Sequence, residues 1–361
     1  MLDLTSSLFL GRTHESADGT PLTTGRPAAM DEPHAAVDLA DRLARAAGAD
    51  AGVLHRSTLH ALVDLMTVLA PATVLIDAAA YPLSRLAADL SADRAGTVVR
   101  PFRHRDVAHA AAVAARLPRP LVVLADGWCV ECGLPAPLAA LQSVADAHGA
   151  TLVVDDTQAL GVLGRRAPGE PFGIGGGGTL PWSGLAATGT VRVASLAKGH
   201  GVPLAVTVGP QALVDRLRSA DLRWHTSPPT TVEIAAASRA VGDRAGNRRL
   251  LRRLGALVRR LRLGLLRRGW PVLGRPFPVV PVATDEPGLA AALAAGLRRR
   301  GVRGLVLGGR CRRFPSLAFV LTARHQPADV DRVLAALAQV SVDQSVERVG
   351  ERAGDQGEWW P

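Results

Sequence analysis

Short apolar runs alternate along the chain with longer stretches whose apolar residues recur at helical spacing. The runs are typical of buried strands, and the longer stretches are typical of helices. We expect strands at residues 73–76, 97–100, 121–124, 151–155 and 191–194, and helices at 36–47, from 58 onward, and at 83–90, 107–117 and 137–148. This alternation predicts an α/β fold with a mainly parallel sheet and covering helices.

Polar residues that could take part in catalysis or ligand binding follow two of the expected strands. Asp155 ends the apolar run at 151–154, and Ser195 and Lys198 follow the run at 191–194. A parallel sheet presents its ligand sites at the carboxyl ends of its strands. We therefore expect these three side chains to share one site.

Lys198 suggests the chemistry of that site. It is one of very few lysines, because the basic residues are almost all arginine, and it is followed by Gly199, which permits close approach of the backbone to a ligand. A lysine in this setting can form a Schiff base with the aldehyde of pyridoxal 5'-phosphate, while a buried Asp155 keeps the pyridine nitrogen protonated. The alternative is an ordinary loop lysine. Asp156 is expected to tolerate substitution by Asn.

Two segments could bind an anionic group. Ser57 and Thr58 would open a helix whose free N–H groups favour a phosphate, although a plain N-cap explains them as well. The glycine-rich run at 173–178 lacks the Lys-Ser/Thr of a P-loop, so we expect a mobile loop beside the active site.

Length and composition bound the class of protein. A chain of 361 residues with 48% hydrophobic residues suggests two domains. No apolar run is long enough to cross a bilayer, and residues 1–30 lack the order of a signal peptide. We expect a cytoplasmic protein.

The net charge of +10 has a simple explanation. Much of the excess lies at 247–268, where leucines form a helical apolar stripe and arginines fill the other face, as on a solvated helix. Acidic ligands such as CoA could bind to part of the remaining positive charge. No nucleic-acid-binding motif accompanies the charge, and aromatic residues are only 4%.

Two of the cysteines lie in a segment that is similar to a thioredoxin Trp-Cys-x-x-Cys motif. Trp128-Cys129-Val130-Glu131-Cys132 follows a strand, as in a thioredoxin, but the next helix is expected to start near Pro135 and not at the first cysteine. Only Cys311 remains to complete a metal site, so no metal is expected.

Three motifs resemble the α-oxoamine synthase branch of fold-type I pyridoxal-phosphate enzymes, the group of 8-amino-7-oxononanoate synthase and 2-amino-3-ketobutyrate CoA ligase. Residues 4–11 are similar to the family's N-terminal arm, 153–164 to its Asp-Asp-Ala-His-Gly-x-Gly-Val-Leu-Gly segment, and 321–325 fall near the end of its C-terminal domain. The resemblance implies an aminotransferase-like fold, with a large cofactor-binding domain and a small α+β C-terminal domain.

The resemblance also implies roles for single residues. Tyr81 falls on the family histidine that lies over the cofactor ring, and its ring can stack there. Gln158 replaces the histidine of Asp-Asp-Ala-His, so it can hydrogen-bond the cofactor's phenolic oxygen but cannot transfer a proton. Ser316 falls on the arginine that binds the substrate carboxylate. Arginines 310, 312 and 313 could replace it, or the substrate is not a plain α-amino acid.

A further motif implies a shared active site. Thr226-Ser227-Pro228-Pro229 is similar to the family's Thr-Ser-x-Pro-Pro, which reaches the cofactor phosphate of the neighbouring subunit. The resemblance therefore implies a homodimer. We expect an arm at 1–35, a large domain at 36–228, a small domain at 229–340 and a flexible tail at 341–361.

The implied activity is a decarboxylative condensation of an amino acid or amine with an acyl thioester of CoA or a carrier protein. Lys198, Asp155, Tyr81 and Gln158 would be catalytic. Transamination, another carbanion reaction, or a partner subunit that binds the cofactor without catalysis are the alternatives.

Overall fold

The computed structural model describes residues 1–12, 22, 27, 30, 32–186 and 189–354, with only the backbone of 341–354. The chain forms two compact units. The small unit comprises Met1–Ser7, Glu131–Gly133 and Leu254–Pro361, and the large unit comprises Leu8–Val130 and Leu134–Arg253. This division falls later in the chain than the domain boundary expected after residue 228.

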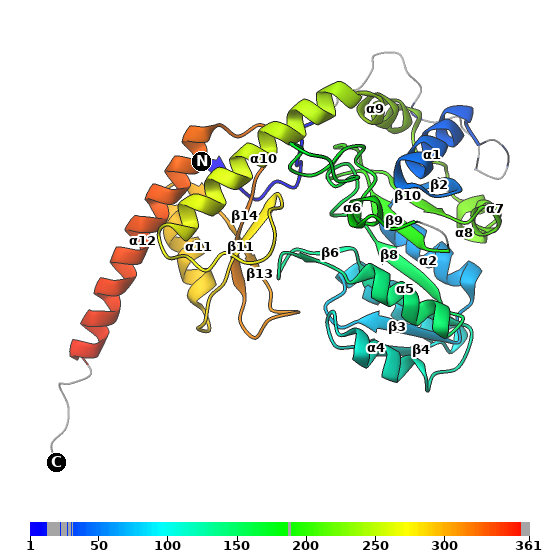
Figure 1. The fold of residues 1–361 in the computed structure, drawn as a ribbon, viewed down its shortest axis with the longest axis horizontal. Helices are drawn as coiled ribbons and strands as arrows, with labels where there is room; N and C mark the ends of the chain where they lie inside the picture. The colour runs from blue at the N-terminus through cyan, green and yellow to red at the C-terminus, as the bar shows by residue number, and fades with distance from the viewer. Residues whose placement is uncertain (13–21, 23–26, 28–29, 31, 187–188, 355–361) are drawn as a thin grey trace. The chain divides into compact units, whose positions relative to one another are not determined.

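A seven-stranded sheet forms the centre of the large unit (Figure 1). All its strands are parallel except β10, which runs antiparallel to both neighbours. In spatial order the strands are β2 (Ala51–His55), β10 (Ala205–Gly209), β9 (Val191–Ser195), β8 (Thr151–Asp155), β5 (Leu121–Asp126), β3 (Thr73–Asp77) and β4 (Val98–Phe102). The predicted mainly parallel sheet is confirmed.

Helices cover both faces of this sheet. One face packs against α2 (Thr58–Leu69), α3 (Pro82–Ala95) and α7 (Gln211–Arg218). The other packs against α1 (His34–Ala47), α4 (Val107–Ala114), α5 (Leu138–Ala147) and α9 (Thr231–Gly242). The short helices α6 (Thr179–Ser183) and α8 (Asp221–His225) complete the unit.

Alternation within each strand explains the two packed faces. In β8, the side chain of Val153 joins the cluster around α2 and α3, whereas Leu152 and Val154 join the cluster around α4 and α5. Successive strand residues point to opposite faces, so a strand covered on both sides must be apolar throughout. This is why short uninterrupted apolar runs marked the strands.

The segment after the first two cysteines differs from its prediction. A helix was expected near Pro135, but β6 (Trp128–Cys129) and β7 (Leu134–Pro135) form an antiparallel hairpin, and α5 begins only at Leu138. Proline suits the first turn of a helix, but it suits a short edge strand equally well.

The small unit contains two sheets and three helical segments. Its elements are β1 (Leu2–Asp3) paired with β12 (Val302–Arg303), the antiparallel sheet of β11 (Val279–Val282), β14 (Ser316–Val320) and β13 (Leu305–Leu307), helices α11 (Leu289–Arg299) and α12 (Pro327–Gly354), and the later part of α10 (Arg244–Leu266). The tail predicted from Ser341 is wrong as far as Gly354, because α12 continues through it. The tryptophans at 359 and 360 lie outside the described residues.

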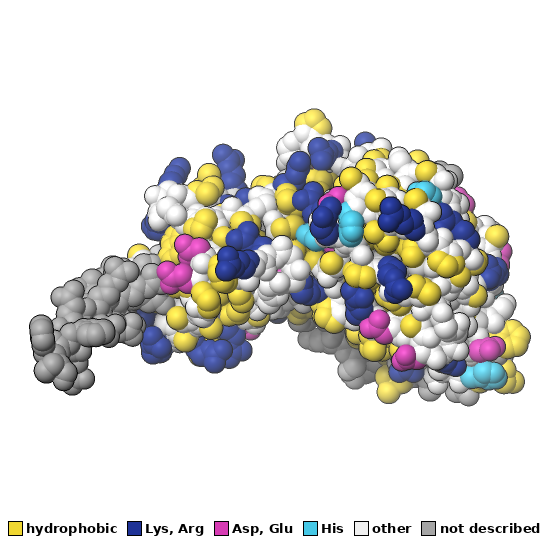
Figure 2. Space-filling model, turned by 90° about the horizontal axis from the view of Figure 1, so that it is seen from below, with side chains coloured by type: hydrophobic (Ala, Val, Ile, Leu, Met, Phe, Trp, Pro, Cys, Tyr) yellow, Lys and Arg dark blue, Asp and Glu magenta, His cyan; other side chains and the backbone are white. Residues whose placement is uncertain are grey.

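Helix α10 confirms the interpretation of the charge excess. Its leucines at 251, 254, 257, 261 and 265 are buried, and its arginines at 252, 253, 259 and 260 are exposed. Basic side chains are more frequent than acidic ones on the face shown in Figure 2. Among the helices that the structure describes, none is both long and apolar enough to span a membrane.

Candidate functional site

Five strands of the large unit end at one edge of the sheet with polar residues. The last residues of β2, β3, β5, β8 and β9 are His55, Asp77, Asp126, Asp155 and Ser195. These strands are mutually parallel, so their carboxyl ends meet at the same edge. The edge therefore gathers carboxylates, hydroxyls and a histidine where a ligand of the sheet would lie.

Asp155 and Lys198 interact electrostatically at this edge. Burial raises the pKa of Asp155, while hydrogen bonds from Thr157 and the positive charge of Lys198 act in the opposite direction. Burial also lowers the pKa of Lys198, and Asp155 opposes that shift. The desolvation of both groups outweighs their mutual attraction, as expected for a pair held away from water. A lysine with a lowered pKa is more often a neutral amine, which is the form that attacks an aldehyde.

Lys198 is the only lysine in the chain. Its backbone carbonyl accepts a hydrogen bond from the N–H of Phe9 at 3.2 Å, and the N–H of Ala197 donates to the hydroxyl of Ser195 at 3.1 Å. The Lys198 turn is thus fixed from both sides.

Thr157 connects the two strands that carry these groups. Its backbone N–H donates to Oδ1 of Asp155 at 2.9 Å, and its hydroxyl oxygen accepts from the N–H of Ser195 at 3.1 Å. No role for Thr157 was predicted from the sequence. Its position two residues after Asp155 is a common one for a side chain that hydrogen-bonds a turn, and this was the available signal.

The side chain of Asp156 makes buried hydrogen bonds that stabilise the fold. Its carboxylate accepts from the N–H of Thr179 at 2.9 Å and from the Thr179 hydroxyl at 2.7 Å, and the side chain is buried. A Cβ on Gly178 would approach its Oδ2 to 1.9 Å, so only glycine fits there. These bonds give Asp156 a role in stability, and the expectation that Asp156→Asn leaves the cofactor chemistry intact stays a prediction.

The residues proposed for the phosphate lie at the start of α2. Ser57 is the N-cap of this helix and accepts from the N–H of His60, so its capping role is confirmed. Thr58 is buried behind it. Thr226 and Ser227 line a small hollow of about 20 Å³ together with Arg56 and His60 of the same chain. One chain by itself thus brings all four predicted residues to the first turn of α2.

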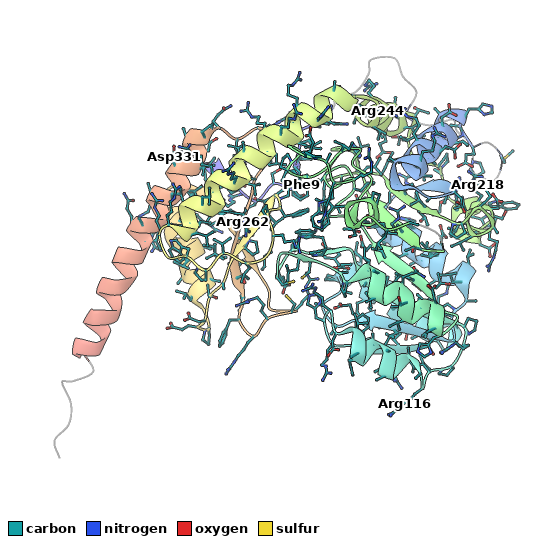
Figure 3. The ribbon with its side chains drawn as sticks, in the orientation of Figure 1. Phe9, Arg116, Arg218, Arg244, Arg262 and Asp331 are labelled. Carbon is teal, nitrogen blue, oxygen red and sulfur yellow. The ribbon has the colours of Figure 1, made fainter. Side chains whose placement is uncertain are left out.

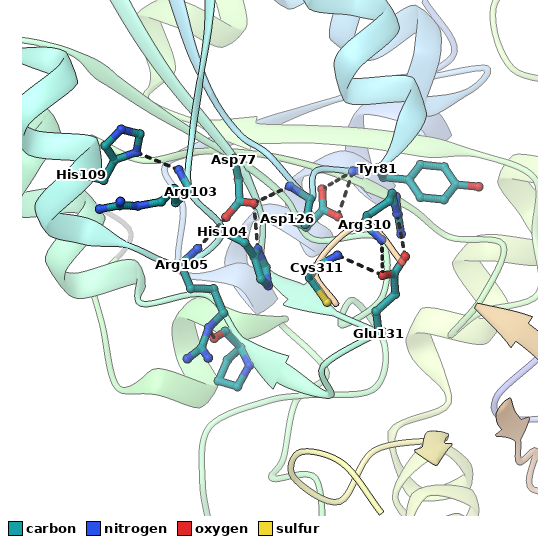
Figure 4. Close-up of polar contacts among 12 residues, drawn as sticks. Asp77, Tyr81, Arg103, His104, Arg105, His109, Asp126, Glu131, Arg310 and Cys311 are labelled. Atoms are coloured by element: carbon teal, nitrogen blue, oxygen red, sulfur yellow. Dashed lines mark hydrogen bonds and ion pairs between the residues drawn. The ribbon is translucent and has the colours of Figure 1, made fainter. Parts of the chain in front are cut away.

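Tyr81 caps α3 near the same edge, and its ring is 46% exposed. Its backbone N–H donates to both carboxylate oxygens of Asp126 at 3.1 Å (Figure 4). Beside it, Asp77 accepts from the ring of His104 at 2.8 Å and from the N–H of Arg105 at 3.1 Å. Asp126 and His104 were not predicted from the sequence, although Asp126 lies two residues after a predicted strand.

Gln158 follows Thr157 and is partly exposed. The glycine-rich run after it is better fixed than expected. Gly161 donates to the carbonyl of Gly176 at 2.7 Å, and Ile174 donates to that of Arg165 at 2.9 Å. These bonds, together with close backbone packing at Gly173, argue against a mobile loop.

Ser316 and the three nearby arginines all belong to the small unit. Ser316 is buried at the start of β14, and its hydroxyl has no hydrogen-bond partner among the described residues. Nε of Arg310 donates to Oε1 of the buried Glu131 at 2.8 Å. Arg313 lies over the ring of Phe314, with its guanidinium carbon 5.1 Å from the ring centroid. Arg312 has an unbonded, buried Nε within the described part of the chain.

The three cysteines form no disulfide within the described residues, and each has a nearby ligand-type side chain in its own unit. In the large unit, the ligand atoms of His104 and Cys129 lie within 4.8 Å of one another. In the small unit, the sulfurs of Cys132 and Cys311 do the same. The sequence analysis counted Cys311 as the only further ligand and missed His104. The absence of a metal stays a prediction.

Curated relatives match a large part of the chain. A 260-residue stretch is 36% identical to 8-amino-7-oxononanoate synthase of Halorhodospira halophila, covering 68% of this chain and 60% of the relative. A 257-residue stretch is 35% identical to the same enzyme of Alkalilimnicola ehrlichii, covering 68% and 62%. The chain thus matches less than two thirds of the length of these relatives. No family profile matches it.

Solved structures share the fold. Serine palmitoyltransferase of Sphingomonas wittichii superposes with a TM-score of 0.76 at 20% identity, over 90% of this chain and 80% of its own. The 8-amino-7-oxononanoate synthase of Francisella tularensis gives 0.72 at 14% identity, over 95% and 98%. The sheet order and these neighbours show that the chain has the fold of fold-type I pyridoxal-phosphate enzymes. Within this class, the chain is similar to enzymes of the α-oxoamine synthase family.

Proposed function

We propose that the chain is a pyridoxal-phosphate-dependent acyltransferase that joins an amino acid or amine to an acyl thioester, with loss of carboxylate. The observation that carries the proposal is the pair formed by the buried Asp155 and the half-buried Lys198 at the carboxyl edge of the sheet. The motifs at 153–164 and the relatives named above support the acyl transfer. The amino substrate and the acyl donor, whether CoA or a carrier protein, are open to test.

The residues at this edge fit pyridoxal phosphate. Lys198 would attach its aldehyde, Asp155 would face its pyridine nitrogen, and the free N–H groups at the start of α2 would bind its phosphate together with Ser57, Thr58 and Ser195. When bound, the cofactor stabilises negative charge on the α-carbon of an amino substrate.

Four side chains of the protein would have separate roles in the reaction. Asp155, already desolvated, holds a proton on the pyridine nitrogen, which an exposed carboxylate would do poorly. The amine of Lys198 would take the α-proton of the amino substrate, and its lowered pKa favours the neutral form that this role needs. Gln158 would donate a hydrogen bond without moving a proton, and the ring of Tyr81 could stack on the cofactor.

Two departures from the family motifs favour a second candidate function. Gln158 replaces a histidine and Ser316 replaces a carboxylate-binding arginine, so transamination, other carbanion chemistry, or cofactor binding without catalysis stays in competition. Lys198 and Asp155 both remain, which favours catalysis over a subunit that only binds a partner, although a protein that binds the cofactor without catalysis would use them as well.

A spectral screen separates these candidates. Purified protein with pyridoxal phosphate is mixed with single amino acids and amines, and then with acyl thioesters. An amine-induced change of the visible spectrum followed by release of free thiol on adding the thioester supports the acyltransferase. An amine-induced loss of the visible band that a 2-oxo acid reverses supports transamination, and a spectrum that no amine changes supports the binding protein.

We also propose a cytoplasmic homodimer in which Thr226 and Ser227 reach the partner's cofactor phosphate. The three cysteines are free thiols, as is usual in a reducing compartment. The Thr-Ser-Pro-Pro motif supports the shared site.

A further inference from the structure

A cavity of about 520 Å³ opens in the large unit beside the proposed active site. Its walls are α1, the loop at 161–176, the end of α9 and the first turns of α10. Apolar side chains form one part of the lining: Leu43, Ala46, Ala167, Ile174, Val241 and Leu251. Cavities of this volume and apolar character hold small organic ligands. We call it the α1–α10 cavity.

The remaining lining is basic. Four arginines contribute to it, at 42, 45, 244 and 248, and no acidic residue does. Arg42 is bonded to the carbonyl of Ser238 at 3.1 Å, and Arg248 is paired with Glu170 at 2.6 Å. The side chains of Arg45 and Arg244 make no hydrogen bond or ion pair with any residue that the structure describes. Figure 3 shows Arg244 where α10 begins.

Backbone donors supplement the two available guanidinium groups. Gly175 and Gly176 have positive φ values of 91° and 64° and line the cavity. Within the described ranges, their N–H groups donate to no acceptor. Guanidinium and amide donors together suit a carboxylate, phosphate or sulfonate.

We propose that the α1–α10 cavity binds a small amphipathic organic anion, with its apolar body inside and its charged group at Arg45 and Arg244. The site is separate from the proposed cofactor site, because none of the nine residues predicted to bind the cofactor lines it. Two of its lining residues, Gly161 and His200, belong to the segments that carry Gln158 and Lys198. An occupant would therefore contact the backbone on which the proposed active site is built.

Titration with the fluorescent anion 8-anilinonaphthalene-1-sulfonate tests the proposal. The full chain, saturated with pyridoxal phosphate to block the other site, should show saturable binding of one probe. The double change Arg45→Gln with Arg244→Gln should weaken binding about tenfold, from the loss of charge-assisted hydrogen bonds. Ala167→Trp, which fills the cavity, should weaken it without removing charge. Arg116→Gln, an exposed arginine of the same unit that does not line the cavity, should leave it unchanged.

Competition identifies the ligand class. Decanoate and decyl phosphate should displace the probe, and the order of their affinities tells which headgroup the site prefers. Decanol, of similar length but neutral, should displace it at least tenfold less well. Equal displacement by decanol, unchanged binding in the double arginine variant, or no saturable binding in the parent overturns the proposal. The arginine and Ala167 variants change only the cavity lining, so their effect on probe binding is independent of the proposed function.

Discussion

The hydroxyl oxygen of Thr157 accepts a hydrogen bond from the backbone N–H of Ser195 at 3.1 Å. This bond connects the turn after β8, which carries Asp155, to the end of β9, which leads to Lys198. The relative position of the carboxylate and the amine therefore depends on a side chain that is neither acid nor base.

Removing the Thr157 side chain should disturb Asp155 in a pH-dependent way. Its hydrogen bonds lower the pKa of Asp155 against the effect of burial, so Thr157→Ala should raise that pKa further. A carboxyl group with a higher pKa becomes protonated earlier as the pH falls. The pH below which cofactor affinity falls, measured by fluorescence titration, should therefore be higher than in the parent protein.

Thr157→Ser keeps the hydroxyl and should restore the parent pH profile. Thr157→Val, similar in shape to Thr, should behave like Thr157→Ala. If the Ala and Val variants kept the parent profile, Thr157 would have only a packing role.

Lys198 should be identifiable by its titration. Burial lowers its pKa, so the unprotonated amine persists below the usual lysine range near 10.4. Reductive methylation of the cofactor-free protein, followed by peptide mass spectrometry, gives the pH at which this single lysine becomes reactive. We expect a midpoint below that of the urea-unfolded chain.

Asp155→Asn removes the charge that raises the pKa of Lys198, so the midpoint should move lower still. A midpoint equal to that of the unfolded chain would contradict the buried site. With cofactor added, borohydride should fix it to Lys198, and Lys198→Ala should abolish the visible absorbance.

Substitution of the two neighbouring aspartates should have different effects, one on the reaction and one on stability. Asp155→Asn should leave the cofactor bound but strongly reduce exchange of the substrate α-proton, since a neutral pyridine accepts electrons poorly. Asp156→Asn should instead lower the free energy of unfolding by about 1–3 kcal/mol, because its buried bonds to Thr179 are disturbed. Denaturant unfolding and proton exchange by NMR measure the two effects. The reverse outcome would place the pyridine nitrogen at Asp156.

Thr226 and Ser227 offer a test of the homodimer. Because hydrogen bonds to charged groups contribute about 1.5–3 kcal/mol each, Thr226→Ala with Ser227→Ala should weaken cofactor binding at least tenfold. Light scattering should give a dimer. A monomer that still binds the cofactor tightly contradicts the shared site.

Mixed dimers distinguish the two possible geometries. Lys198→Ala chains are mixed with the Thr226 and Ser227 double variant. If these residues reach across subunits, each mixed dimer has one intact site and regains tight binding. If they act within their own chain, as their common hollow with His60 also allows, mixing restores nothing.

The sequence predicted the features that depend on local pattern. The strands that end in Asp155 and Ser195 were found because doubly covered strands are apolar throughout. The lysine was found because its residue type is rare in this chain. Helix α2 was placed by Ser57, whose side chain does cap it.

Features that depend on register or on distant partners were missed. The bond from Ser195 to Thr157 follows from the pairing of β8 with β9, which no local pattern contains. The role of Asp156 depends on Thr179, which follows a long loop. The helix from 341 to 354 was read as a tail because its sequence is polar, although polar residues are compatible with an exposed helix.

The substrate carboxylate provides the last prediction. Ser316 stands where an arginine was expected, so another cation must meet a free α-carboxylate. Arg310 already pairs with the buried Glu131, and Arg313 lies over Phe314. Arg312 is the least engaged of the three. Arg312→Gln should therefore raise the apparent Kd of the amino substrate most, by about ten- to a hundredfold.

Arg310→Gln and Arg313→Gln are the matched variants, each also removing one charge. Arg310→Gln should mainly reduce stability, because it leaves Glu131 buried without its ion pair. Spectral titration with the amino substrate and thermal unfolding separate these effects. If all three variants bound the substrate like the parent, no arginine here would meet a carboxylate. An amine, an ester or a carrier-bound aminoacyl group would then be the better substrate class, since Ser316 offers only an uncharged hydroxyl.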